Sequence, residues 1–202
     1  MTQYIVRAAR AHEWPEIGRV LGRAFATDPV WRWVVRDHDH IAARVGAALA
    51  AVARLHAGTC DVVDSGDATI GAVAQWAAPG HWRLPVTSYL RIAPTALRAL
   101  GPSSIGKIGA LGVMDKKHPR EPHWYLGILG TDPDHQGRGL ASALLEHRLS
   151  VCDRELVPAY LESSKESNIS FYERHGFRVV EEVPLAKDGP HIWTMWRDPQ
   201  HG

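Results

Sequence analysis

The segment most suggestive of chemistry is residues 131–141, which is dense in glycine. It follows an apolar run and precedes an amphipathic pattern, so it should join a buried strand to a long helix. The first N–H groups of a helix lack partners inside the helix, and the helix dipole favours an anion there. Gly137 and Gly139 remove side chains that would hold a diphosphate away from the backbone. The segment therefore predicts a pyrophosphate cradle, to which Arg138 would add a cation unless it faces solvent.

Two other nucleotide motifs and a plain helix cap compete with this interpretation. No Gly-Lys-Ser/Thr follows the glycines, which excludes a P-loop. A dinucleotide fingerprint fits better, because Gly137-x-Gly139-x-x-Ser142 nearly matches it and Glu162 lies about 20 residues on. However, Ser142 stands where a third Gly or Ala is wanted, the turn is longer than a tight dinucleotide turn, and the unit comes late in the chain. From this segment alone, a glycine-rich cap that binds nothing is also possible.

The apolar pattern places this segment within alternating strands and helices. It predicts strands at 4–8, 60–64, 68–77, 124–130, 158–162, 177–185 and 191–196. It predicts helices at 13–25, 40–56, 139–156 and 168–175, and a mostly helical stretch at 84–115 that Pro94 and Gly101-Pro102 interrupt. Asp28-Pro29 should end the first helix. A mixed α/β sheet is expected.

Bulk composition narrows the class of protein. The chain has 202 residues, 45% of them apolar and 22% charged, which favours one globular domain with a real core. A net charge of +1 gives no reason to expect a nucleic-acid partner. No apolar stretch is long enough to span a bilayer, and the first residues lack a signal-peptide pattern. Two cysteines are too few for a disulfide framework, so we expect a cytoplasmic protein. Because no stretch could span a bilayer, we expect no membrane partner.

Two motifs in order resemble those of the GCN5-related N-acetyltransferases (GNAT). Gln136-x-x-Gly139-x-Ala141 is similar to the CoA motif of that family, Gln/Arg-x-x-Gly-x-Gly/Ala. Downstream, residues 168–177 resemble its Asn-x-x-x-Tyr-x-x-x-Gly-Phe segment. The resemblance extends to the puromycin N-acetyltransferase branch and covers nearly all of the chain. The segments that carry it are 23–26, 72–76, 118–122, 133–140, 171–174 and 189–193.

The resemblance implies one GNAT-type α/β (α+β) domain over residues 1–202. Its central sheet would be mixed, mostly antiparallel and twisted, flanked by helices, with a parallel splayed strand pair at the CoA site. Residues 1–115 would supply mainly acceptor-side helices and the first strands, and residues 118–202 the acetyl-CoA-binding core. The implied co-substrate is acetyl-CoA. The residues expected to bind it are Ile128, Leu129, Gly130, Gln136, Gly137, Arg138, Gly139, Leu140, Ala141, Ser142, Asn168 and Tyr172.

Catalytic roles follow from the same resemblance. Tyr172 matches the position that protonates the departing CoA sulfur, although a tyrosine on a short helix can also simply pack on the sheet. An amine must be neutral to attack, so a carboxylate or an ordered water has to accept a proton. Glu162 is the candidate base or amine anchor, and the alternative is a solvated strand end. Asn168 would hold the pantetheine arm, cap the short helix, or both.

The acceptor is expected to be a small-molecule amine. Phe25, Trp31, Trp33 and Trp76, with Trp82, would line a flat aromatic pocket, or would pack as ordinary core and rim residues. The resemblance suggests an aminonucleoside antibiotic such as puromycin, and hence a role in antibiotic resistance. His38-x-His40 lacks a third ligand at suitable spacing, so no metal site is expected.

Two alternative functions stay open. One is a protein acetyltransferase acting on a lysine or an N-terminus, which an open groove would favour. The other is a non-catalytic sensor that binds CoA without turnover. A monomer and a homodimer are both compatible with the sequence.

Overall fold

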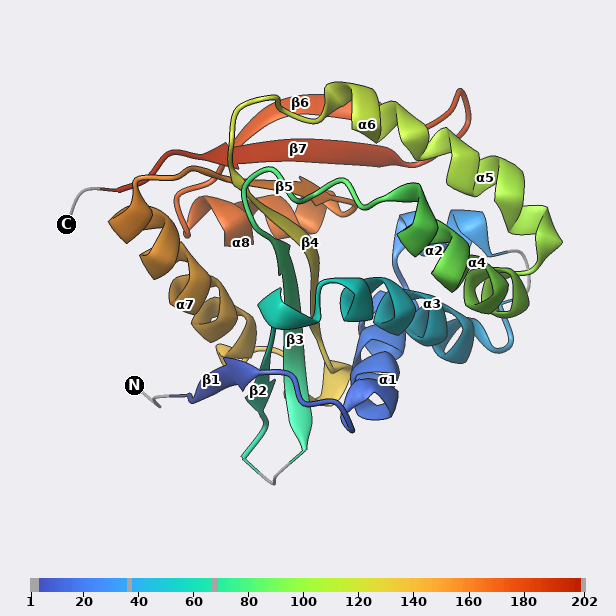
Figure 1. Ribbon diagram of the computed structural model, residues 1–202, viewed down its shortest axis with the longest axis horizontal. Coiled ribbons are helices and arrows are strands. Elements are labelled where there is room, and N and C mark those ends of the chain that lie inside the picture. The colour runs from blue at the N-terminus through green and yellow to red at the C-terminus, as the bar shows by residue number, and fades with distance from the viewer. Residues whose placement is uncertain (1–3, 36–37, 67–68, 201–202) are drawn as a thin grey trace.

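One sheet organises the chain, with strands in the order β1-β2-β3-β4-β5-β7-β6 (Figure 1). The computed structural model describes residues 4–35, 38–66 and 69–200. Within them the strands are β1 (Val6–Ala8), β2 (Cys60–Asp64), β3 (Ile70–Ala77), β4 (Trp124–Thr131), β5 (Ala159–Ser163), β6 (Arg178–Pro184) and β7 (His191–Arg197). Neighbouring strands are antiparallel except β4 and β5, which are parallel. The expected mixed, mostly antiparallel sheet is confirmed.

The parallel pair separates partway along its length. β4 pairs with β5 only from Trp124 to Leu126, opposite Ala159 to Leu161. On its other edge, β4 has an irregularity: Gln75 of β3 pairs with Ile128 and Trp76 pairs with Leu126, which leaves Gly127 unmatched. An extra residue of this kind bends its strand. A gap therefore opens between β4 and β5 beside Gly127 and next to Glu162, one residue beyond the last pair. This is the expected splayed strand pair.

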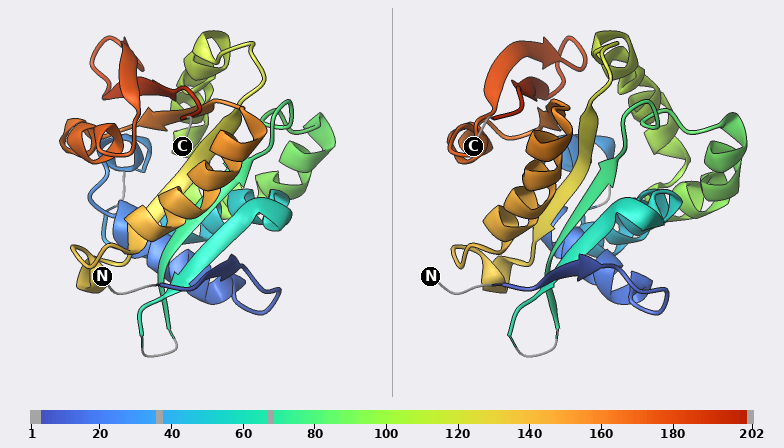
Figure 2. Two further views of the ribbon diagram at one scale, coloured as in Figure 1. Left: turned by 90° about the vertical axis from the view of Figure 1, so that its left-hand side faces the viewer. Right: turned by 60° about the vertical axis from the view of Figure 1, so that its left-hand side comes forward.

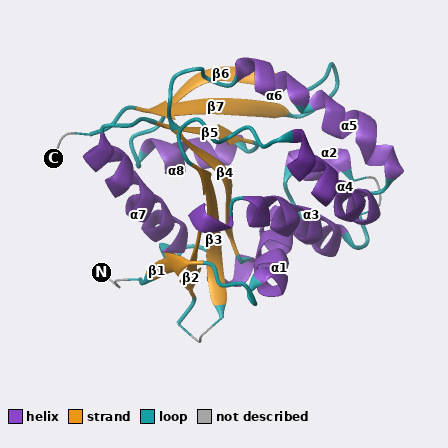
Figure 3. Ribbon diagram, in the orientation of Figure 1, coloured by secondary structure: helices purple, strands orange, loops and turns teal. Residues whose placement is uncertain are grey.

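Helices cover both faces of the sheet (Figures 2 and 3). Those of the N-terminal half are α1 (Trp14–Phe25), α2 (Pro29–Val34), α3 (Ile41–Leu55), α4 (Val86–Leu100), α5 (Ile105–Ala110) and α6 (Gly112–Lys117). They lie together on one side, while α7 (Leu140–Glu155) and α8 (Ile169–Glu173) lie on the other. Each side has its own apolar core: Ile17 and Leu21 of α1 belong to one, and Leu144 and Leu145 of α7 to the other. None of the helices in the described residues is long and apolar enough to cross a membrane.

Two helices differ from the expectations. Asp28-Pro29 does end α1, but it also begins α2, because the Asp28 carboxylate accepts hydrogen bonds from the backbone N–H groups of Val30 and Trp31. Pro29 suits the first turn of that helix, where its missing N–H is not needed. The helix α4 continues past Pro94 to Leu100, and Gly101 is its C-cap. Leu90, four residues before Pro94, is exposed, so water can bond the carbonyl that Pro94 leaves without a donor. Of the expected strand at 68–77, residue 68 lies outside the described residues.

Candidate active site

A cleft of about 630 Å³ runs from the gap between β4 and β5 to the start of α7; we call it the long cleft. Its walls come from β4, β5, α8, the end of α1 and the turn before α7. Most of the residues expected to bind a cofactor line it. They are Leu129, Gly130, Gln136, Gly137, Gly139, Leu140, Ala141, Ser142, Asn168 and Tyr172, joined by Phe25 and Glu162. Residues far apart in the chain are thus brought to one site.

The turn before α7 has the backbone of an anion site. Gly137 and Gly139 have φ values of 74° and 87°, which side-chain-bearing residues rarely adopt. A β-carbon added at Gly137 would meet nothing within 4 Å, so the space above that backbone is open. The first bond inside α7 runs from the N–H of Ala143 to the carbonyl of Gly139, and the amides before it have no partner within the helix. The turn can therefore receive a diphosphate on bare N–H groups.

Charges around this turn are arranged to tolerate an anion. The Asp132 carboxylate is buried and lies 2.8 Å from Arg19 and 3.1 Å from Arg23. Arg23 also reaches Asp134 at 2.7 Å. Both acidic side chains of the turn are thus neutralised by α1, while Lys165 and Arg174 line the cleft as cations.

Two expected cofactor residues lie elsewhere. Arg138 is not among the lining residues; its guanidinium donates to the carbonyl of Asp134, and its own carbonyl accepts from the Tyr4 hydroxyl. Ile128 turns its side chain to the opposite side of β4. Only its backbone is available at the strand gap. Asn168 precedes α8 but makes no side-chain cap, so its amide is left to face the long cleft.

Tyr172 enters the long cleft from α8 and is itself buried. Burial raises the pKa of its phenol, and the charge of Asp28 raises it further. Asp28 lines the same cleft and is held by its bonds to the start of α2 and by the Ser164 hydroxyl. The Tyr172 hydroxyl therefore keeps its proton at neutral pH and can act as a proton donor.

Glu162 is not a solvated strand end. Its side chain is 15% exposed. Its carboxylate accepts hydrogen bonds from the hydroxyls of Tyr160 at 3.1 Å and Tyr125 at 3.3 Å. Burial raises the pKa of both phenols, so they remain donors. The Nδ1 atom of His118 lies 3.6 Å from the same carboxylate. The Glu162 carboxylate thus lies in an aromatic enclosure and accepts hydrogen bonds from its walls.

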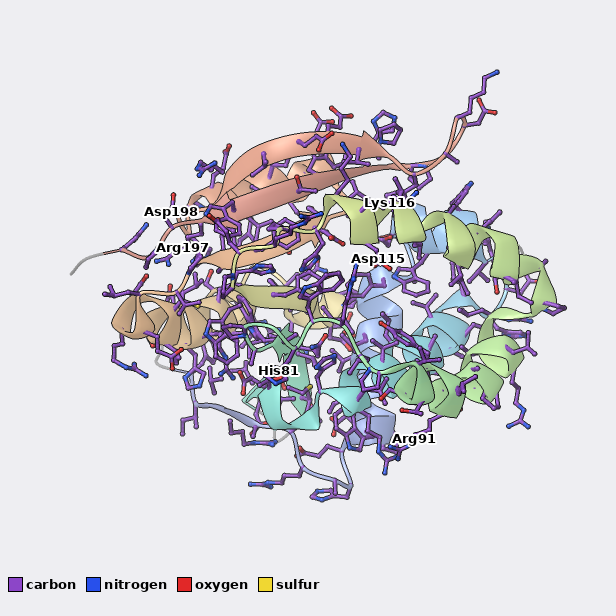
Figure 4. All side chains as sticks on the ribbon, turned by 45° about the horizontal axis from the view of Figure 1, so that its top comes forward. His81, Arg91, Asp115, Lys116, Arg197 and Asp198 are labelled. Atoms are coloured by element: carbon purple, nitrogen blue, oxygen red, sulfur yellow. The ribbon has the colours of Figure 1, made fainter. Side chains whose placement is uncertain are left out.

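A second space of about 200 Å³, the small cavity, lies across β4 from the long cleft. Gly127 and Glu162 line both spaces, so the two meet at the strand gap. The walls of the small cavity are largely apolar or aromatic and include Leu55, Trp82, Tyr89, Ile92 and Tyr125. Asp115 of α6, labelled in Figure 4, adds a second carboxylate. Among the described residues that line this cavity, none is Lys or Arg.

The aromatic acceptor set expected from the sequence is only partly brought together. Phe25 lines the long cleft and Trp82 the small cavity. Trp31 and Trp33 pack on the core from α2 and line neither space. Trp76 is 0% exposed and packs in the core on the α7 side. Because side chains alternate along a strand, Gln75 faces the small cavity and Trp76 the opposite side. The acceptor assignment of Trp76 is therefore corrected to a core role.

Sequence reasoning missed most of the small cavity. His118 and Tyr125, which line it, and Tyr160, which contacts His118, are spread over three segments, and nothing in their spacing joins them. The available signal was the stretch from His118 to Pro122, which matched the family without an assigned role. In the part of the chain that the structure describes, no three His, Cys, Asp or Glu side chains could hold a metal ion.

Comparison with known proteins agrees with this geometry. Residues 103–179 match the acetyltransferase (GNAT) domain family. An 84-residue segment is 36% identical to an uncharacterized N-acetyltransferase of Schizosaccharomyces pombe. That match covers 40% of this chain and about a third, 34%, of the relative.

Two solved structures have the same fold along the whole chain. A Corynebacterium glutamicum protein described as histone acetyltransferase HPA2 and related acetyltransferase superposes with a TM-score of 0.74 at 26% identity, covering 100% of this chain and 99% of that one. Arylalkylamine N-acetyltransferase 2 from Aedes aegypti gives a TM-score of 0.67 at 14% identity, covering 98% and 100%, and shows the fold alone. The segment that matches the acetyltransferase (GNAT) domain family thus includes β4, the glycine turn, α7, β5 and α8, and the whole chain shares its fold with these solved structures.

Proposed function

We propose that this protein is an acetyl-CoA-dependent N-acetyltransferase whose acceptor is a small amine with an apolar or aromatic body. One observation carries the proposal: the long cleft and the small cavity meet at Gly127 and Glu162, through the gap between β4 and β5. A donor in the cleft and an amine in the cavity would there be within reach of each other. Direct transfer needs no covalent enzyme intermediate if both reactants are held together in this way.

The long cleft would bind acetyl-CoA along its length. The amides at the start of α7 and the Gly137 turn would bind the diphosphate, with Lys165 and Arg174 as nearby cations. The free backbone edge of β4 beyond Leu126 would pair with the pantetheine arm as an added strand. A backbone N–H there would polarise the acetyl carbonyl. When bound, acetyl-CoA supplies a thioester-activated acetyl group.

Two side chains would manage the protons of the reaction. Glu162 would take a proton from the ammonium group, so that the nitrogen can attack the carbonyl carbon. Tyr172 would give its proton to the sulfur as the C–S bond breaks, and would be reprotonated, through water, by the second proton that the attacking nitrogen loses as the amide forms. The net change is acetyl transfer, formation of the CoA thiol and release of one proton.

The walls of the small cavity favour a particular kind of acceptor. Trp82, Tyr89 and Ile92 offer apolar contact, while Glu162 and Asp115 would attract a cation. The Aedes aegypti protein of similar fold is named an arylalkylamine N-acetyltransferase. An arylalkylamine would fit the apolar and acidic lining of the small cavity. An aminonucleoside such as puromycin also combines an amine with a flat aromatic body, and its acetylation would give a role in antibiotic resistance. A protein lysine would need an open groove, and a cavity of about 200 Å³ favours a small molecule instead.

The test is an amine panel read by release of CoA thiol from acetyl-CoA. The panel contains tryptamine, agmatine, spermidine, puromycin and a lysine-containing histone-tail peptide. We expect turnover with at least one small amine, and faster turnover with aromatic amines than with spermidine. Turnover with the peptide alone would replace this proposal by the protein acetyltransferase. Tight CoA binding in calorimetry with no turnover across the panel would identify a CoA sensor.

A further inference from the structure

Two buried histidines connect Glu162 to the backbone behind it. His118 Nδ1 lies 3.6 Å from the Glu162 carboxylate, and His118 Nε2 lies 3.0 Å from Nε2 of His123. On its far side, His123 Nδ1 lies 2.6 Å from the carbonyl oxygen of Glu121. Both histidines are buried, and His118 stacks on Trp82 at 3.6 Å between ring centroids. Hydrogen bonds join His118, His123 and the carbonyl of Glu121, and the 3.6 Å contact with Glu162, which is longer than a hydrogen bond, extends this chain to the carboxylate.

Hydrogen-bond chemistry fixes most of the protons in this chain. A carbonyl oxygen only accepts, so His123 Nδ1 must carry a proton. The two Nε2 atoms share one hydrogen bond, so one donates and the other accepts. Burial lowers the pKa of His123, which keeps this ring neutral with a bare Nε2. His118 Nε2 must therefore be the donor. No hydrogen bond determines whether His118 Nδ1 carries a proton, because the Glu162 carboxylate lies 3.6 Å away.

We propose that His118 and Glu162 act as one base, in which His118 accepts the proton that Glu162 takes from the acceptor amine, and that His123 holds His118 in the required tautomer. This inference rests on the proposed function. In it, Glu162 is the group that touches the amine, while His118 and His123 are positioning residues that act through Glu162.

The proposed proton transfer balances in two steps. An N–H bond of the ammonium group breaks as an O–H bond forms on Glu162. That O–H bond then breaks as an N–H bond forms on His118 Nδ1, which leaves Glu162 anionic beside an imidazolium. The Nε2–H bond of His118 and its hydrogen bond to His123 are unchanged throughout. Because His118 lines the small cavity, it can give this proton to water after the product leaves.

The groups around His118 suit a cationic intermediate. Tyr125 and Tyr160 contact its ring edge-on, and burial raises the pKa of both phenols, so they stay neutral. Asp115 of α6 lines the same cavity and supplies a second negative charge. His56 lies at the same cavity, and burial lowers its pKa, so it adds no positive charge at neutral pH. Stacking on Trp82 further favours an imidazolium.

The first test needs no turnover, so it is independent of the proposed function. Side-chain ¹⁵N chemical shifts of the histidines are followed by NMR through a pH titration of the wild type and of Glu162→Gln. We expect His123 to show a protonated Nδ1 and an unprotonated Nε2 in both proteins at neutral pH. We expect the ¹⁵N signal of His118 Nδ1 to differ between the two proteins, because the carboxylate that faces this atom is replaced by an amide. An unchanged His118 Nδ1 signal, or a His123 protonated on Nε2, would overturn the proposal.

The second test uses whichever amine of the panel turns over. His118→Gln should lower kcat by about 10- to 100-fold with KM changed by less than about threefold, as expected when a proton acceptor is lost. The acidic limb of its kcat profile should also move, because that limb belongs to the coupled pair in the wild type. His147→Gln, a change at an exposed histidine on α7, is the matched control and should leave both unchanged. If His118→Gln folds with a native circular dichroism spectrum and keeps the wild-type pH profile, His118 takes no part in the base.

Discussion

At the scale of single residues, the proposed acid and base are separated by their surroundings. Tyr172 lies in the long cleft, where burial and Asp28 together raise the pKa of its phenol. Glu162 instead accepts hydrogen bonds from the phenol hydroxyls of Tyr125 and Tyr160. The proposed acid is therefore enclosed as a proton donor, and the proposed base is an acceptor of hydrogen bonds. Such divergent environments are how one fold assigns acid and base roles.

Replacing Tyr172 by Phe should slow the reaction without weakening donor binding. The substitution removes only the hydroxyl group. In this mechanism no other side chain at the cleft would protonate the leaving sulfur. We expect kcat to fall by about 100-fold, the lower end of the range for general acid catalysis, because a thiolate is already a fair leaving group. Thiol release measures the rate, and calorimetry with CoA supplies the control. A rate within about twofold of wild type would remove Tyr172 from the acid role.

The sequence identified two residues that line the long cleft, Tyr172 and Glu162, more readily than the walls of the small cavity. Tyr172 lies within a motif and Glu162 at the end of a clear strand, so both could be named in advance. The walls around Glu162 depend on which face of β3 and β4 a residue occupies. A one-residue difference places Gln75 at the small cavity and Trp76 in the opposite core. The bulge at Gly127 shifts that alternation, and nothing in the local sequence marks it.

At the scale of elements, the turn before α7 depends on glycine for its backbone. Gly137→Ala should weaken acetyl-CoA binding, because a methyl group would enter the open space above the turn and the φ of 74° disfavours any side chain. We expect the Kd to rise by about tenfold, which corresponds to about 1.4 kcal/mol. Calorimetric titration with acetyl-CoA provides the measurement.

Gly58→Ala is the matched control for that change. A β-carbon at Gly58 also meets nothing within 4 Å, but the φ of Gly58 lies outside the positive range and Gly58 does not line the long cleft. Its Kd for acetyl-CoA should equal that of the wild type. Equal affinities for the two alanine variants would mean that the α7 turn does not bind the diphosphate.

Arg197 joins three elements at the end of β7 (Figure 4). It donates two hydrogen bonds to Asp153 of α7, at 2.7 and 2.9 Å, and one to the carbonyl of His175 at 2.9 Å. Its side chain is 4% exposed. Arg197→Met should therefore lower the free energy of unfolding by about 3 kcal/mol, near the lower end for a broken buried pair because Asp153 is partly exposed.

The neighbouring pair Arg178–Asp198 provides the comparison for Arg197. Its atoms are 3.4 Å apart, and its side chains are 63% and 68% exposed. Arg178→Met should change stability by no more than about 0.5 kcal/mol, since solvent screens such pairs. Urea unfolding of both variants is the measurement. Similar losses for the two arginines would show that burial does not decide the strength of these pairs.

Element predictions succeeded where the pattern was long and failed where a short signal had two meanings. The helix expected at 139–156 is α7, Leu140–Glu155, because its apolar face repeats over four turns. Asp28-Pro29 is both a stop and a start, and only the former was predicted. Pro94 was expected to interrupt a helix, yet the exposed α4 tolerates it. A cytoplasmic location and a monomeric or homodimeric state remain predictions, since neither follows from the contacts inside one chain.

At the scale of the whole molecule, the two proposed binding spaces lie on either side of β4 and meet at the strand gap. The long cleft runs from this gap to the start of α7 and is also lined by the end of α1, while helices of the N-terminal half and residues of β3 and β4 line the small cavity. The family match covers residues 103–179, and more than half of the residues that line the small cavity precede that segment. In the proposed function, the donor and the acceptor are therefore recognised by largely different parts of the chain.

One buried and two half-buried histidines, distributed over the molecule, make its stability depend on pH. Burial is the largest cause of the lowered pKa values of His56, His123 and His175. In the unfolded chain these groups return to an ordinary pKa near 6.5. Below that pH the unfolded chain binds more protons than the folded one, so stability is fully present above about pH 6.5 and is lost as the pH falls through the folded-state values.

The midpoint of urea unfolding should accordingly be constant from about pH 8 to about pH 7 and should fall between about pH 6.5 and about pH 5. Each histidine can contribute at most about 1.4 kcal/mol per pH unit in that window. The pKa of Glu13 is lowered chiefly by its hydrogen bond with Arg7. The stability that this carboxylate contributes is lost only below its ordinary pKa of 4.5, so its titration does not overlap with that of the histidines. His175→Gln, which keeps a polar group near the Ser142 hydroxyl at 3.1 Å, should flatten the slope. A midpoint that stays constant down to about pH 5 would contradict the argument, because it would require that folding leave the proton affinity of all three histidines unchanged.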